Sequence, residues 1–215
     1  MRWEIDPSNL GEVLACAGIA RLSNPAQTGF DGTTFVCADG VLDDLDPSVT
    51  ETSHGLRLCG YDLDWWQPWG LNPGLKNWSG RQTPFTAHRE SADRAQGVSA
   101  RDWRIYTAPA RGQLYVDTLA TWDARSVGWS LNEQPQHQVA GRPWLELLAS
   151  IGLQAFPVAG RRAEGFVYHL WNPLPLAAAM AAFAGYGPGI YSSRGYRAPT
   201  AKSGQVTYLL TATPL

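Results

Sequence analysis

The segment 6–22, DPSNLGEVLACAGIARL, constrains the fold most, because it joins a clear helix start to an almost uncharged helix body. Asn9 can act as the N-cap, and Glu12, three residues later, can reach back to the free backbone N–H groups as in a capping box. The helix is therefore expected to begin at Leu10. Because only Glu12 and Arg21 carry charge along the helix, it has little face for water and belongs in a core.

Further elements follow from local patterns. Small residues at positions 15–18 allow a sheet or a second helix to approach the first helix closely. Two more helices are expected at 143–154, where a proline occupies the first turn, and within the alanine-rich segment 174–184. A basic helix or loop is expected at 85–96. Segments rich in β-branched and aromatic residues predict strands at 33–38, 56–66, 104–107, 114–118, 166–171 and 206–211.

These elements predict an α+β fold in a single domain over residues 1–215, with a mixed, largely antiparallel sheet packed by about three helices. Apolar residues make up 44% of the chain and charged residues 17%, which is typical of a folded protein. No apolar run approaches the roughly 20 residues of a membrane span, and the first residues lack the apolar core of a signal peptide. We therefore expect a cytoplasmic protein with no membrane partner.

Metal, disulfide and enzyme signatures are missing from the sequence. Cys16, Cys37 and Cys59 are odd in number and lack C-x-x-C spacing, which argues against a disulfide framework and a thiolate zinc site. Common nucleotide, zinc-protease and hydrolase motifs are absent. Asp117 and Asp123 could pair for acid–base chemistry, but turn and capping roles are more common for such aspartates. We expect no cofactor, no metal and no catalysis.

Charge is divided unevenly along the chain, although the net charge is only −2. Seven acids lie between positions 39 and 64, against the single base Arg57. The balance reverses at 76–111, and after Glu164 there is no acidic side chain at all. Such a division can produce a basic face on a nearly neutral protein, or the charges can scatter over the folded surface. The sequence leaves both interpretations open.

The glycine-rich segment 185–213 is the candidate nucleic-acid interface. Hydroxyls and backbone N–H groups can cradle a sugar-phosphate chain, guanidinium groups can neutralise it, and tyrosines can stack on bases. The expected contact residues in this segment are Tyr191, Ser192, Ser193, Arg194, Tyr196, Arg197 and Lys202. Arg161 and Arg162 are further candidates for phosphate contacts, with simple solvation as the alternative. For the segment itself, the alternative is a flexible hairpin.

A second candidate surface is the tryptophan-rich segment that contains Trp65, Trp66, Trp69 and Trp78, with prolines and glycines between them. Their rings can form a platform for bases or sugars, or they can anchor a proline-rich loop in the core. With the Asp62/Asp64 pair beside them, they motivate an alternative function: a carbohydrate-binding or carbohydrate-active protein with a tryptophan-lined cleft.

Three stretches resemble recurring blocks of one known family: IDPSNLGEVLACAGIARL at 5–22, WDARSVGWSLN at 122–132 and RPWLELLASIGLQAF at 142–156. They are similar to subunits of type I-U, also called I-G, CRISPR interference complexes, although Leu10 stands where that family usually has proline. The resemblance implies a non-catalytic, compact large-subunit-type or accessory component of a Cascade-like effector complex in antiviral defence. Its implied partners are guide RNA and/or target DNA, together with other CRISPR complex subunits.

Overall fold

The computed structural model describes residues 1–53, 55–63, 84–109, 116–118, 140–161, 163–203 and 206–215. Within these ranges helices and antiparallel strands alternate along the chain, which confirms the expected α+β class. The helices are α1 (Leu10–Leu22), α2 (Pro84–Ala95), α3 (Pro143–Ala155) and α4 (Leu176–Phe183), with a short 3-10 helix η1 (Ala100–Asp102).

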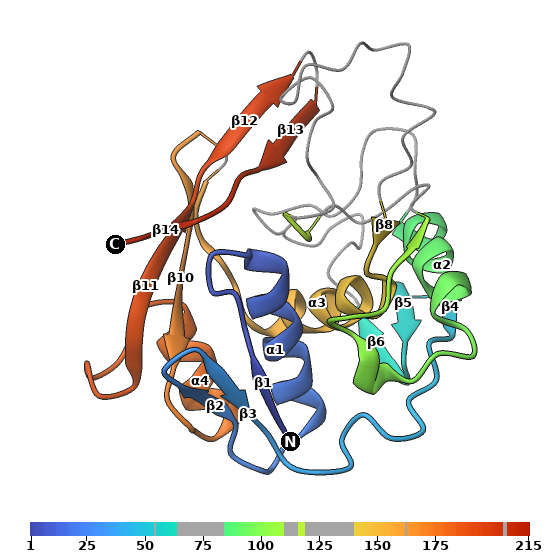
Figure 1. Ribbon diagram of the computed structural model, residues 1–215, viewed down its shortest axis with the longest axis horizontal. Helices are drawn as coiled ribbons and strands as arrows, with labels where there is room; N and C mark the ends of the chain where they lie inside the picture. Colours follow the sequence, from blue (N-terminus) through green and yellow to red (C-terminus); the bar gives the residue numbers. More distant parts are fainter. Residues whose placement is uncertain (54, 64–83, 110–115, 119–139, 162, 204–205) are drawn as a thin grey trace.

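Helix α1 lies at the centre of the molecule and begins where the sequence predicts (Figure 1). Asn9 is its N-cap, and Oδ1 of Asn9 accepts a hydrogen bond from the Gly11 N–H at 3.0 Å. The carboxylate of Glu12 accepts at 3.0 Å from the N–H of Asp6, three residues before the cap, and not from the cap residue itself. Residues 10–20 are all buried, so the expectation of a core helix is confirmed.

Helix α3 packs closely against the small residues of α1. A Cβ atom built on Gly18 would lie 2.0 Å from the carbonyl oxygen of Leu148, and one built on Gly152 would lie 2.1 Å from that of Leu14. Real Cβ atoms do not approach a carbonyl oxygen so closely, so the contact between the two helix backbones requires glycine at positions 18 and 152. The predicted helix at 143–154 is confirmed as α3, and its Gly152 faces α1.

The strands of the described residues form five antiparallel sheets. Two of them have three strands, in the orders β1-β3-β2 and β4-β5-β6, and one has four, in the order β14-β11-β10-β9. The remaining two are the pairs β12-β13 and β7-β8. The strands are β1 (Arg2–Glu4), β2 (Gly29–Asp31), β3 (Thr34–Val36), β4 (Val49–Thr52), β5 (Gly55–Leu58), β6 (Tyr61–Leu63), β7 (Ala108–Pro109), β8 (Ala140–Gly141), β9 (Ala159–Arg161), β10 (Gly165–Trp171), β11 (Ser192–Ala198), β12 (Thr200–Ser203), β13 (Val206–Leu209) and β14 (Thr213–Pro214).

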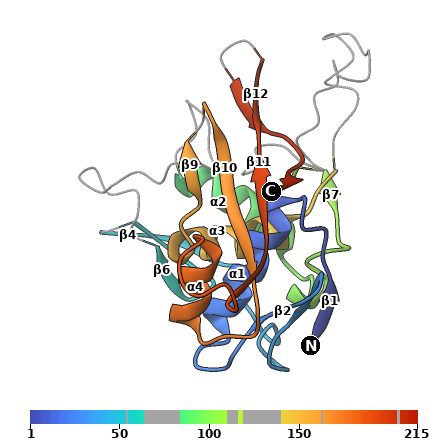
Figure 2. The ribbon, with the colours of Figure 1, turned by 90° about the vertical axis from the view of Figure 1, so that its left-hand side faces the viewer.

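These sheets lie on two sides of the α1–α3 pair. In Figure 1 the four-stranded sheet and α4 are on the left, whereas α2 and the β4-β5-β6 sheet are on the right. Strand β11 leads directly into β12, and the β12–β13 hairpin projects away from the helices in both views (Figures 1 and 2). Aromatic rings fill the space between α1, α3 and the left-hand sheet, with Trp171 in contact with Phe30, Phe156 and Phe183.

Most predicted elements are found close to their expected positions. The strands expected at 33–38, 166–171 and 206–211 correspond to β3, β10 and β13, and the helix expected at 174–184 corresponds to α4. Of the two alternatives for 85–96, helix or loop, the structure has the helix, α2. The expected strand at 56–66 appears as β5 and β6, separated by a turn in which Cys59 and Gly60 adopt positive φ. Its last residues lie outside the described ranges.

Two strand predictions are wrong. Residues 104 and 105 belong to a turn that continues η1, because the backbone N–H groups of Ile105 and Tyr106 both donate to the carbonyl of Asp102, and residues 106 and 107 form no strand. In the segment 114–118, only residues 116–118 are described, and they are not a strand. The β-branched and aromatic pattern failed at 104–107 because the neighbouring capped turn supplies the backbone hydrogen bonds locally.

Among the described residues, no helix combines the length and the apolar character needed to cross a bilayer.

Candidate nucleic-acid interface

The segment predicted to be a glycine-rich phosphate loop forms a regular strand, β11, in its central part. Residues 194–198 pair with residues 170–166 of β10, and Tyr196 and Arg197 also pair with Pro214 and Thr213 of β14. The register shift between Leu170 and Trp171 lies just before this regular stretch. Gly195 therefore does not supply a loop conformation. Hydroxyls and arginines are instead presented by an extended backbone.

Arg194 and Arg197 lie on opposite faces of the sheet. Successive side chains of a strand alternate between faces, and β11 follows this rule: Tyr196 and Ala198 are buried, whereas Arg197 is exposed between them. Arg194 shares the face of Tyr196 and Ala198 but is itself exposed at the start of the strand. The two guanidinium groups therefore cannot line one straight path.

Both arginines lack an acidic partner. Arg194 and Arg197 are the arginines of the described residues whose side chains have no recorded hydrogen bond and no ion pair. Every other described arginine except Arg21 pairs with a carboxylate, and Arg21 is bound to Gln154 and stacks over Tyr61. The paired arginines are Arg2, Arg57, Arg89, Arg94, Arg101, Arg104, Arg142 and Arg161.

Three acids of the segment 39–64 are paired with cations other than Arg194 and Arg197. Asp39 binds the N-terminal ammonium group, Asp43 binds Arg101, and Asp62 binds Arg57 at 2.8 Å. Hydrogen bonds from these partners hold the pKa of all three carboxyl groups below the usual range. These three acids therefore do not pair with Arg194 or Arg197.

The tyrosines and serines of the predicted interface have different environments. Tyr196 is only 3% exposed and stacks on Tyr168 with ring centroids 5.8 Å apart. Its ring is part of the core and is not accessible to a base, which corrects its predicted role. Tyr191 packs partly against the core. Ser192 is half-buried and Ser193 is exposed at the start of β11.

The remaining predicted contacts are less informative. Arg161 is exposed but forms an ion pair with Glu164 at 3.0 Å, across the turn between β9 and β10. Arg162 lies outside the described residues. Lys202 belongs to β12, where its backbone is opposite Thr207. The tryptophan cluster at 65–78 and Asp64 also lie outside the described residues, so the proposed carbohydrate cleft is represented only by Asp62.

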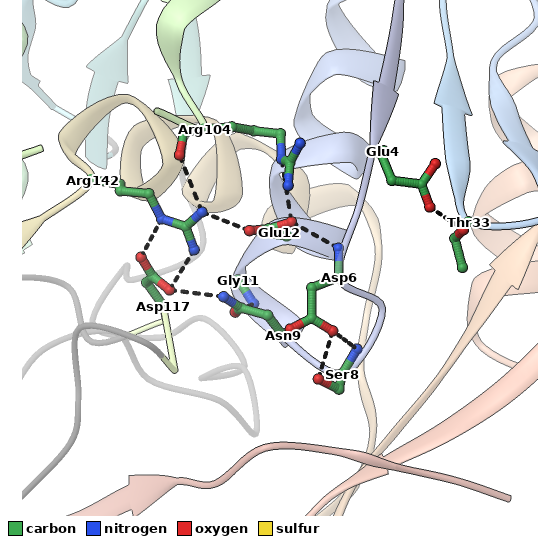
Figure 3. A network of polar contacts seen from close by, with 10 residues as sticks. All are labelled: Glu4, Asp6, Ser8, Asn9, Gly11, Glu12, Thr33, Arg104, Asp117 and Arg142. Carbon is green, nitrogen blue, oxygen red and sulfur yellow. Dashed lines mark hydrogen bonds and ion pairs between the residues drawn. The ribbon is translucent and has the colours of Figure 1, made fainter. Parts of the chain in front are cut away.

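A buried ionic network, not predicted from the sequence, connects α1, the start of α3 and the segment 116–118 (Figure 3). Arg142 donates through Nη1 to Glu12 at 2.6 Å, and through Nε and Nη2 to the two oxygens of Asp117. Asn9 donates to Asp117 at 2.8 Å, and Arg104 approaches Glu12 at 3.4 Å. The side chains of Glu12, Asp117 and Arg142 are at most 8% exposed.

The network balances two buried carboxylates against two arginines. Burial disfavours the charge on Arg142, but the hydrogen bonds and charges of Asp117 and Glu12 outweigh it, so the pKa of Arg142 is raised above its ordinary value. Arg142 thus remains charged, as its partners require. Asp117, considered from sequence as one of a catalytic pair with Asp123, has its carboxylate bound by Arg142 and Asn9; Asp123 lies outside the described residues.

The loop that precedes α1 is bound to the side of the molecule that carries β11. The loop preceding α1 accepts hydrogen bonds from two parts of that side of the molecule: the Tyr168 hydroxyl donates to the Pro7 carbonyl at 2.7 Å, and the Ala212 N–H donates to the Ser8 carbonyl at 2.8 Å. Within the described ranges, no group of three or more His, Cys, Asp or Glu side chains is arranged to hold a metal ion. Strand β11 pairs with β10 and with β14, so its backbone holds Arg194 and Arg197 in fixed positions.

Sequence reasoning missed the network because its members lie far apart along the chain. The available signal was the isolated Glu12 in an apolar helix, together with Arg142 immediately before another apolar helix. Buried charges of that kind require partners.

Comparison with known proteins gives no relatives for this chain: no family model, curated protein or solved structure matches it.

Proposed function

We propose that this chain is a non-catalytic subunit of an RNA-guided, type I-U CRISPR surveillance complex, in which it contacts the backbone of guide RNA or target DNA. The kinship rests on the resemblance of segments 5–22, 122–132 and 142–156 to that family. The nucleic-acid contact rests on one structural observation: the side chains of Arg194 and Arg197 are exposed on β11 with no recorded hydrogen bond or ion pair, whereas most other arginines of the described residues have acidic partners.

An unpaired, exposed guanidinium group is well suited to a phosphate. It carries a permanent charge, presents several donors, and does not have to break an existing ion pair before binding. The sequence after Glu164 contains no acidic side chain that would repel a nucleic acid near β11. Because the two arginines lie on opposite faces, each contacts a separate stretch of backbone, or one of them contacts a neighbouring subunit.

Co-purification tests the assignment to a complex. A tagged copy expressed with its neighbouring genes is expected to bring down guide RNA and other CRISPR subunits, and sequencing of the bound RNA identifies the guide. A free monomer that binds glycans and ignores RNA would contradict the proposal and support the carbohydrate-binding alternative.

A salt series tests the phosphate contacts in the assembled complex. Each phosphate contact contributes close to 0.9 to the log–log slope of affinity against salt on duplex DNA, and about 0.7 on single strands. Arg194→Ala and Arg197→Ala, separately and together, are expected to reduce this slope while the melting temperature stays unchanged. Arg57→Ala is the matched control, because it removes the same charge from an arginine already paired with Asp62.

The single variants distinguish the two possible roles of each arginine. A reduced slope with intact assembly indicates a phosphate contact, and lost assembly with unchanged folding indicates a protein interface. An unchanged slope in both variants, with intact folding and assembly, would refute the phosphate role.

A further inference from the structure

Tyr186 is an exposed aromatic side chain on a fixed backbone. Its side chain is 73% exposed, and it lies three residues after Phe183, the last residue of helix α4. The helix ends in a Schellman motif: the N–H of Gly185 donates to the Ala182 carbonyl at 3.0 Å, and the N–H of Tyr186 donates to the Ala181 carbonyl at 2.8 Å. Gly185 has the positive φ, +83°, that this motif requires. The ring of Tyr186 is thus presented to solvent from a rigid position.

The other end of the same loop is also anchored. The backbone N–H of Asn172 donates to the Tyr191 carbonyl at 2.9 Å, its side-chain amide donates to the Ile190 carbonyl, and the N–H of Tyr191 donates to the Pro188 carbonyl at 2.9 Å. Ile190 is nevertheless 74% exposed. Two apolar side chains, Tyr186 and Ile190, therefore remain in water on a loop whose ends are both bound.

Gly185, the residue before Tyr186, lies beside the face of β11 that carries Arg197. A Cβ atom on Gly185 would lie 2.9 Å from Cε1 of His169, and one on Gly195 would lie 2.8 Å from Nε2 of the same ring. The imidazole of His169 thus fills the space between the two glycines. Gly195 and Arg197 are two residues apart and share one face of β11, about 7 Å apart along the strand.

We infer that Tyr186, His169 and Arg197 form a surface, called here the Tyr186 surface, that binds unpaired nucleotides, with a base stacked on Tyr186 and a phosphate bound by Arg197. The inference rests on the proposed function and specifies the form of nucleic acid that one face of β11 takes. A base exposes its flat faces to a protein ring only when it is unpaired and unstacked, so an aromatic ring beside a free cation favours a single strand over a duplex.

The experiment measures the affinity of the full-length chain for two labelled probes by fluorescence anisotropy over a salt series. One probe is oligouridine, which has little structure of its own, and the other is an RNA duplex of equal length. Tyr186→Ala is expected to weaken oligouridine binding about five-fold or more, the effect of losing one stacked base. Tyr186→Phe, which keeps the ring, is expected to bind more tightly than Tyr186→Ala. Ile190→Ala, which removes an equally exposed apolar group from the same loop, is expected to bind like the wild type.

Arg197→Ala supplies the second readout. It is expected to reduce the salt slope on oligouridine by about 0.7, whereas Tyr186→Ala leaves that slope unchanged. If the wild type binds RNA but Tyr186→Ala does not change oligouridine affinity, or weakens duplex binding equally, the inference is refuted while the proposed function stands. If the wild type binds neither probe, the RNA-contacting role of the isolated chain and this inference fail together, and only the pull-down of the complex still bears on subunit membership.

Discussion

Arg142 binds Asp117 through two parallel hydrogen bonds, from Nε to Oδ2 at 2.7 Å and from Nη2 to Oδ1 at 2.8 Å. This bidentate pair joins the residue before α3 to residues 116–118, which pack against the N-terminus of α1. Gly11 allows that contact, because a Cβ atom there would lie 2.5 Å from the carbonyl oxygen of Val116. The start of α1 is therefore fixed by a neighbour that is distant in sequence.

Arg142→Met tests the energetic role of this pair. The substitution keeps much of the side-chain volume but leaves Asp117 and Glu12 buried with one fewer positive charge, so the free energy of unfolding is expected to fall by about 3–5 kcal/mol. Urea denaturation followed by circular dichroism measures the change. Arg57→Met is the control, because its pair with Asp62 is exposed, and it is expected to have little effect. A similar small loss in both variants would contradict this role for the network.

Asn9→Asp separates helix capping from the network. Aspartate is ordinarily as good an N-cap as asparagine, but Nδ2 of Asn9 donates to Asp117 at 2.8 Å in a fully buried position. Aspartate would replace the amide donor by a second carboxylate facing Asp117, so the buried hydrogen bond is lost and we expect a loss of at least about 2 kcal/mol. Thermal denaturation measures it. Ser99→Asp, at the N-cap of η1, is expected to be close to neutral; equal stability of both variants would rule out the buried amide–carboxylate contact.

Gly152→Ala tests the contact between α1 and α3. Alanine favours a helix by about 1 kcal/mol over glycine, yet its Cβ would lie 2.1 Å from the Leu14 carbonyl oxygen. Separating the two helices to relieve this overlap is expected to cost more than that gain, with a net loss of about 1–3 kcal/mol. Gly189→Ala, where no atom lies within 4 Å of the added group, is the control in the same chemical denaturation series. Stabilisation by Gly152→Ala would show that the helices are farther apart than described.

The buried cysteines predict a loss of stability at alkaline pH. Burial raises the pKa of the Cys37 thiol to about 11 and that of the Cys59 thiol to about 12, whereas an unfolded thiol titrates near pH 8.5. The folded state therefore holds these protons more tightly. The resulting stability is fully present below about pH 8.5 and is lost progressively as the pH rises towards 11 and 12.

Unfolding free energies measured at pH 7 and pH 10 check this expectation. The unfolding free energy is expected to fall less between pH 7 and pH 10 in Cys37→Ala and in Cys59→Ala than in the wild type. Each protein is compared with its own value at pH 7. If both variants decline as steeply as the wild type, other groups control the alkaline transition.

Several features of the fold were predictable from local sequence. The limits of α1, its cap at Asn9 and its burial follow from a capping residue and an uncharged helix, because helix starts and amphipathicity are encoded within a few neighbouring residues. The α+β class and the positions of α3, α4 and β10 follow for the same reason. The prediction of strand at 104–107 was wrong because a neighbouring turn satisfied the backbone instead.

The candidate site depended on tertiary structure to a greater degree. The sequence indicated that Arg194 and Arg197 lie in an acid-free segment, but it could not place them on opposite faces, since that depends on β11 pairing with β10 as a strand. It could not separate the buried Tyr196 from the exposed Tyr186 either, because burial is decided by Tyr168 and by the helix end at Gly185. The partners of Glu12, at positions 104 and 142, became visible only in the folded chain: local sequence determines helices and caps, whereas the pairing of charges across more than 90 residues depends on how those elements pack.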